Sequence, residues 1–150
     1  MTNLVHDLGR IVAQVLIARG DSGGTTAQPT IKSHELYVDR IPQTAKDRAI
    51  AIRTDESFRT SRDLSGRMYE LPTIHVTVRG LPNNRENPRD VLLHIDTTLA
   101  AISGIEIELG TRTYRVQSFS RLGAILPINP DTSQRYIWAA GYCVTVTDIT

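Results

Sequence analysis

Cysteine is nearly absent from this chain of 150 residues, in which Cys143 stands alone. A single cysteine excludes an intramolecular disulfide and fits a reducing compartment. Its surroundings, GYCVTV, have the pattern of a strand, which favours a buried structural thiol over a reactive one. No apolar stretch approaches the ~20 residues needed to span a bilayer. Asp7 and Arg10 interrupt the first apolar run, so we expect neither a signal peptide nor a membrane segment.

Lysine is also scarce, since Lys32 and Lys46 are the only lysines among 17 basic residues. Arginine is enriched and lysine depleted in protein interfaces, because the planar guanidinium makes several hydrogen bonds at less entropic cost. Genomic base composition produces the same bias, and both explanations stay open. The formal net charge of +1 gives no general electrostatic footprint for nucleic acid.

Motifs that carry catalysis or bind cofactors are missing from the sequence. Its histidines, at positions 6, 34, 75 and 94, form no HExxH pattern and have no cysteine partners, which argues against zinc. Neither GxxxxGK[ST] nor a GxGxxG following a strand is present, so no phosphate cradle is expected. Glu106 and Glu108 share one strand face, without any sign of a pocket that would shift the pKa of either. We predict a protein that is not an enzyme and takes no cofactor or metal.

The string GDSGG at 20–24 is the exception that needs explaining, because it surrounds the nucleophile of trypsin-like proteases. Those proteases need about 200–250 residues for their barrels. They also place the histidine and the aspartate before the serine, each on a separate element. Here His6 and Asp7 share one short amphipathic segment, so Ser22 has no positioned base. We interpret Gly20 as the end of a helix and residues 21–30 as a flexible connector.

Hydrophobic periodicity predicts the first elements of a single domain spanning residues 1–150. Residues 3–19 have apolar side chains at helical spacing, and residues 34–41 and 48–55 read as strands. Residues 55–70, DESFRTSRDLSGRMYE, are polar and show no clear period. A loop this long is usually functional or disordered, and a solvated hairpin tip remains an equal alternative.

Residues 71–80, LPTIHVTVRG, form the clearest predicted strand, with Ile74, Val76 and Val78 facing one way. A helix over 88–103 follows, capped by Asn87 with Pro88 in its first turn. Strands over 105–109 and 113–119 form a hairpin, residues 121–135 make an irregular excursion, and 135–149 is a long final strand. This order predicts an α+β fold: a largely antiparallel mixed β-sheet, two helices packed on one face and long polar loops.

These patterns together resemble the tail terminator family of long-tailed bacteriophages, also labelled minor capsid or neck proteins. The resemblance covers most of the chain and is strongest from Asp47 onward. It includes the strand that starts DRAIAI, the polar loop before Pro72–Gly80, the helix at 88–103 and the strand at Tyr114-Arg115-Val116. A proline-containing loop with Asp131 and Arg135 then leads into the aromatic final strand. Gly141 departs from the family pattern, which has a polar residue there, often asparagine.

The resemblance implies a structural virion protein, assembled in the host cytoplasm and located at the head-proximal neck of the tail. Six copies would form a ring that caps the tail tube, ends its elongation and joins the tail to the head connector. Its partners would be copies of itself, the major tail tube protein and the head-completion protein, and DNA would pass through the ring without being read. As partner-binding residues on the loop and the rim we predict Phe58, Arg59, Arg62, Arg67, Tyr69, Arg79, Arg115, Asp131 and Arg135.

A second function class stays open, a small nucleic-acid-binding module on a ferredoxin-like sheet. Such modules stack bases on exposed aromatic side chains of the sheet. Aromatic residues make up only 5% of this chain, and the outward positions of the clearest strand, Thr73, His75, Thr77 and Arg79, include none. The aromatic content therefore favours the structural protein.

Overall fold

The computed structural model describes residues 2–62 and 68–150, and the side chains of residues 7–55 and 71–150. Helix α1 (Thr2–Arg19) is followed by three short strands, β1 (Ser22–Gly24), β2 (Pro29–Ile31) and β3 (His34–Val38). Two long strands, β4 (Ala49–Arg62) and β5 (Met68–Pro82), lead to helix α2 (Glu86–Ala100). The chain ends with β6 (Ile105–Leu109), β7 (Arg112–Arg121), β8 (Leu126–Ile128) and β9 (Arg135–Asp148).

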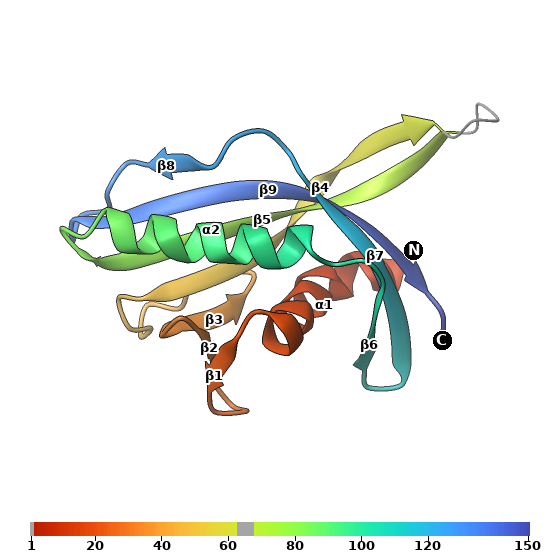
Figure 1. Ribbon diagram of the computed structural model, residues 1–150, viewed down its shortest axis with the longest axis horizontal. Helices are drawn as coiled ribbons and strands as arrows, with labels where there is room; N and C mark the ends of the chain where they lie inside the picture. The colour runs from red at the N-terminus through yellow and green to blue at the C-terminus, as the bar shows by residue number, and fades with distance from the viewer. Residues whose placement is uncertain (1, 63–67) are drawn as a thin grey trace.

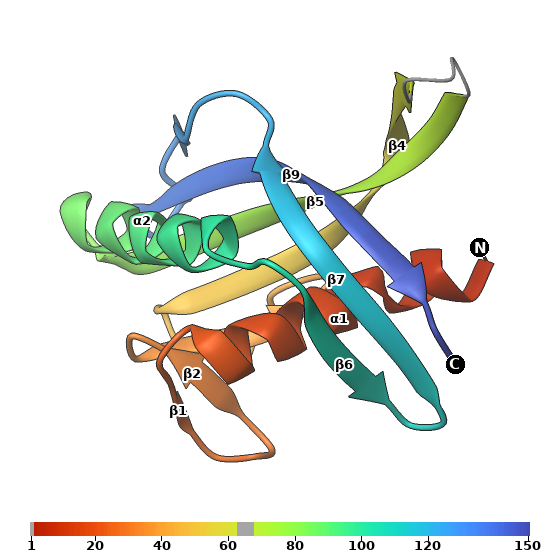
Figure 2. The same cartoon turned by 45° about the vertical axis from the view of Figure 1, so that its right-hand side comes forward.

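The strands form one sheet in the order β1-β2-β3-β4-β5-β9-β7-β6, and β8 pairs with β9 outside this path. Every pairing is antiparallel except that of β3 with β4. Both helices pack on the same face of the sheet, which curls so that the β1–β2 and β6–β7 ends approach α1 from two sides (Figures 1 and 2). The expected α+β architecture with two helices on one face is therefore confirmed.

The core lies between the two helices and the inner face of the sheet. Ile74, Val76 and Val78 are fully buried there, as their alternation along β5 predicts. Gly9 lets α1 approach the sheet, because a Cβ at this position would lie 2.9 Å from the Val38 Cγ1 atom. The other core side chains of the helices are Leu8, Ile11, Val12, Val15 and Leu16 from α1 and Val91, Leu92, Ile95 and Leu99 from α2.

Two segments predicted as loops are strands. The predicted connector at 21–30 contains β1 and β2, an antiparallel pair in which Ser22 lies opposite Ile31. The predicted polar loop at 55–70 is mostly continuous with its flanking strands, since β4 and β5 pair up to Arg62 opposite Met68. A register shift between Thr54 and Phe58 marks an irregularity in this ladder. Backbone pairing forms these strands without an alternating apolar pattern, which is why periodicity missed them.

Two smaller predictions also need correction. The excursion at 121–135 contains the short strand β8, which pairs with β9. Helix α2 begins at Glu86 instead of Pro88, and Asn87 is not its cap. The side chain of Asn84 accepts a hydrogen bond from the Asn87 backbone N–H at 3.1 Å instead. The N-cap position itself is Arg85, whose side chain makes no capping hydrogen bond, so Asn84 supplies this contact from one residue further upstream.

Candidate interaction surface

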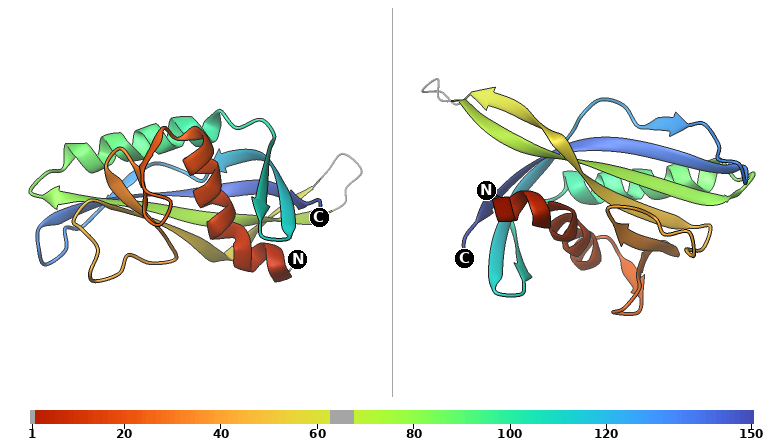
Figure 3. Two further views of the ribbon diagram at one scale, coloured as in Figure 1. Left: turned by 90° about the horizontal axis from the view of Figure 1, so that it is seen from below. Right: turned by 180° about the vertical axis from the view of Figure 1, so that it is seen from behind.

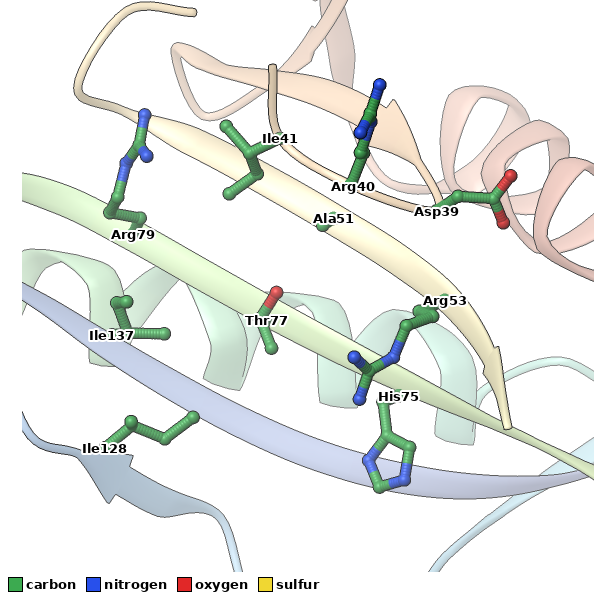
Figure 4. Close-up of a pocket in the computed structure, with 10 residues that line it drawn as sticks. All are labelled: Asp39, Arg40, Ile41, Ala51, Arg53, His75, Thr77, Arg79, Ile128 and Ile137. Carbon is green, nitrogen blue, oxygen red and sulfur yellow. The ribbon is translucent and has the colours of Figure 1, made fainter. Parts of the chain in front are cut away.

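The outer face of the sheet, opposite the helices, carries a shallow hollow with a volume of about 350 Å³. Its floor is formed by Ala51 and Thr77, which are cross-strand partners on β4 and β5, and it lies low because both side chains are small. Larger side chains stand on both sides of this floor, with Ile41 after β3 on one side and Ile128 of β8 on the other (Figure 4). The complete lining consists of Asp39, Arg40, Ile41, Ala51, Arg53, His75, Thr77, Arg79, Ile128 and Ile137.

Strand β8 brings apolar side chains to the solvent beside this hollow. Leu126 and Ile128 are 60% and 45% exposed, and Leu126 has the highest value among the large hydrophobic residues described. They lie opposite Ala139 and Ile137 in the β8–β9 register, so all four side chains share the outer face. Exposed apolar side chains that share one face are typical of association surfaces, which makes this face a candidate interaction surface.

A charge cluster of Asp47, Arg79, Asp131 and Arg135 closes one end of the hollow. The Arg135 guanidinium donates from Nε to Asp131 Oδ2 at 2.8 Å and from Nη1 to Asp47 Oδ1 at 3.1 Å. Arg79 donates from Nε to the backbone carbonyl of Asp47 at 3.0 Å. Burial and the neighbouring Arg135 charge lower the pKa of Arg79, which nevertheless stays protonated at any physiological pH.

Asp131 organises the loop that leads into β9. Burial by itself would raise the pKa of Asp131, but hydrogen bonds from the Arg135 N–H, the Arg135 side chain and the Ser133 N–H outweigh burial and lower it. The two backbone N–H groups donate to Asp131 Oδ1, each at 3.0 Å. The carboxylate therefore fixes both the turn and the guanidinium that reaches across to Asp47.

The other end of the hollow holds His75, whose Nε2 lies 2.9 Å from Asp55 Oδ2. The imidazole covers Gly141 on β9, since a Cβ built there would lie 3.5 Å from the His75 ring. Arg40 and Arg53 stand at the edge of the hollow, and both are exposed. Within the described part of the chain, neither guanidinium contacts a carboxylate.

The structure brings three of the predicted partner-binding residues together, namely Arg79, Asp131 and Arg135 in the charge cluster. Arg115 lies apart from them on β7, where it donates to Glu106 Oε1 at 2.7 Å. The backbones of Phe58, Arg59, Arg62 and Tyr69 belong to β4 and β5, but their side chains, and all of Arg67, lie outside the described residues. Sequence reasoning missed Arg40, Arg53, Leu126 and Ile128, the last two because the three residues of β8 are too few to show the period of a strand.

Ser22 has a structural contact that accounts for its place in GDSGG. Its hydroxyl donates to the Ile17 carbonyl at 2.7 Å, close to the end of α1.

His34 is fully buried with Nδ1 2.8 Å from the Lys32 carbonyl oxygen, and burial lowers the pKa of His34. Among the described residues no group of three or more His, Cys, Asp or Glu side chains is placed to hold a metal ion. Neither helix in the described part of the chain has the length and hydropathy of a membrane span.

A chain of one solved virion structure shares this fold. No family model and no curated protein matches the sequence. Among solved structures, one chain of the "Virion of native gene transfer agent (GTA) particle" superposes with a TM-score of 0.56 at 14% sequence identity. The alignment covers 93% of this chain and 95% of that chain. The two chains therefore share a fold over nearly their whole lengths.

Proposed function

We propose that this protein is a structural component of a tailed, virus-like particle, in which its copies form a ring at the end of the tail. The observation that carries the proposal is the shared fold with a chain of a gene transfer agent virion, aligned over 93% of the sequence. The resemblance of the sequence to tail terminator proteins points the same way and supplies the position in the particle. The ring, most simply of six copies, ends the tail tube and joins it to the head connector.

The long hairpin supports a role in assembly. Among the described residues, β5 pairs with β9 only from Thr73 onward, and residues 68–72 of β5 pair with β4 alone. Together with residues 58–62 of β4 they form an arm that projects from the body of the domain (Figures 1 and 3). An isolated two-stranded hairpin is at best marginally stable in water. A neighbouring subunit or tail protein that packs on the arm would stabilise it.

The outer face of the sheet supports the same role. It combines exposed apolar residues on β8 with arginines that have no carboxylate partner in the described part of the chain. Head-to-tail contacts between unlike surfaces close into a ring when the rotation between copies divides a full turn. Each contact should bury on the order of 800 Å² per partner if it is stable alone.

Deleting the gene and imaging the particles tests the position in the tail. We expect the protein in purified particles at the head-proximal end of the tail, and without it tails of uncontrolled length that do not join heads. A shortened arm, with residues 58–72 replaced by a tight Gly-Ser hairpin turn, should fold and yet fail to restore joined particles. Replacing the exposed turn residues Gln43 and Thr44 with Gly-Ser is the matched control and should restore them. Absence of the protein from the particles, or normal tails after deletion, would disprove the proposal.

A further inference from the structure

The outer-face hollow has a counterpart elsewhere on the same chain. Glu108 of β6 lies opposite Thr113 of β7, and the Thr113 carbonyl accepts a hydrogen bond from the Ile149 N–H at 2.9 Å. These three residues therefore form a row across the sheet. The neighbouring Tyr114 is buried with its hydroxyl on Asp7 of α1, so the row points away from the helices. Ile149 is 40% exposed at one end of the row, and Glu108 is exposed at the other.

Glu108 is an exposed carboxylate that makes no polar contact within the described part of the chain. Of the carboxylates whose side chains the structure describes, only those of Asp39, Glu86 and Glu108 make no hydrogen bond or ion pair. Glu86 lies in the first turn of α2, where its charge favours the helix dipole, and Asp39 itself lines the hollow. Glu108 has neither function. Its charge is opposite to that of Arg40 and Arg53, which line the hollow and make no ion pair with a described carboxylate.

We propose that the row Glu108–Thr113–Ile149 of one copy docks on the outer-face hollow of the next copy. Ile149 enters the hollow between Ile41 and Ile128, and Glu108 pairs with Arg53. This inference rests on the proposed ring and names the two surfaces that meet in it. The occupant is a second copy because one chain carries both halves of the contact, apolar against apolar and carboxylate against guanidinium.

The spacing of the two surfaces agrees with this pairing. Glu108 and Ile149 are two strand positions apart, which is about 10 Å at ~4.8 Å per strand. Arg53 lies one strand across and two residues along from Thr77 in the floor of the hollow, so the distance between these two positions is roughly 8 Å. The long side chains of arginine and glutamate take up the difference.

The contact cannot form within one chain. Ile149 follows the end of β9, whereas the hollow is lined by Ile137 near its beginning, twelve residues or roughly 40 Å earlier along the strand. Glu108 and Arg53 lie on strands that are four positions apart in the sheet. The two surfaces are therefore unlike and separate, as a head-to-tail contact requires.

Charge reversal on the intact chain tests the pairing. Arg53→Glu and Glu108→Arg should each weaken self-association at least about tenfold, measured by sedimentation velocity and native mass spectrometry over a concentration series. The double variant should regain most of the loss, because position 53 of one copy meets position 108 of the next. Arg48→Glu, which reverses an exposed arginine outside the hollow, is the matched control and should associate normally.

Cysteine cross-linking tests the same contact inside the particle. With Ile128→Cys and Ile149→Cys in one chain, oxidation should produce a ladder of covalent oligomers in purified particles, and either single variant should not. This inference would be overturned if both charge-reversal variants self-associate as tightly as the wild type, or if particles contain the double-cysteine protein without any cross-linked ladder. Either result would leave the proposed function standing. A wild-type chain absent from the particles would instead refute the proposed function.

Discussion

Replacing Asp131 with alanine should lower the free energy of unfolding by about 2 kcal/mol at pH 7. The Asp131 carboxylate accepts three hydrogen bonds, from the backbone N–H groups of Ser133 and Arg135 at 3.0 Å each and from Arg135 Nε at 2.8 Å. The substitution removes all three and leaves the guanidinium with Asp47 as its remaining carboxylate partner.

The magnitude follows from the number and the exposure of these bonds. A typical hydrogen bond contributes about 0.5–1.5 kcal/mol, and a bond to a charged group contributes more. The Asp131 side chain is 24% exposed and that of Arg135 is 21% exposed, so water replaces part of the loss. About 2 kcal/mol remains, which corresponds to a fall in melting temperature of roughly 4–8 °C for a chain of this size.

The effect should depend on pH in a defined direction. The folded state lowers the pKa of Asp131, so its contribution is complete above the pKa of the unfolded chain and is lost as the pH falls through the folded-state pKa. Urea denaturation at pH 7 and at successive values below about 4 measures this. The difference between the wild type and Asp131→Ala should narrow steadily as the pH is lowered.

Two further variants separate the causes of this effect. Asp131→Asn keeps a carbonyl oxygen for the two backbone N–H groups but loses the charge, so its stability should lie between those of the wild type and the alanine variant. Asp90→Ala removes a 63%-exposed carboxylate that lies 3.4 Å from Arg89, and it should change the stability by less than about 0.5 kcal/mol. An unchanged stability of Asp131→Ala at pH 7, or a difference that does not shrink in acid, would refute the reasoning.

Four further substitutions test two glycines of the sheet, the buried Tyr114 hydroxyl and Ser22. Gly80→Ala should destabilise by about 1–3 kcal/mol in denaturant unfolding, because its Cβ would lie 2.8 Å from Cδ of the rigid Pro88 ring, whereas Gly141→Ala, with ordinary contacts, should not. Tyr114→Phe should cost about 1 kcal/mol at neutral pH. Burial raises the pKa of Tyr114 to about 12, so the cost should shrink above pH ~10, and absorbance titration should show one phenol fewer near pH 12. Ser22→Ala should stay within about 0.5 kcal/mol and leave particle assembly intact; loss of assembly by a folded variant would reopen the GDSGG question.

Side-chain periodicity was enough to predict the elements that bury one face. The helix predicted at 3–19 is observed at Thr2–Arg19, and the strand predicted at 71–80 lies within β5. Both have apolar residues at the spacing of their own secondary structure, so the signal is local. Strands β1 and β8 gave no such signal, because all of their residues are exposed and backbone pairing alone holds them in the sheet.

The α+β class, the two helices and the inner face of β5 follow from local sequence patterns, because each depends on residues that lie close together in the chain. The sequence also singled out Arg79, Asp131 and Arg135. What these residues contact depends on the tertiary fold, since Arg135 pairs with Asp47, which lies 88 positions away in the chain. The hollow arises in the same way, from the register that sets small side chains beside each other on β4 and β5 and from the path that brings β8 along β9. Such pairings follow from long-range strand register, which no local pattern of hydrophobicity encodes.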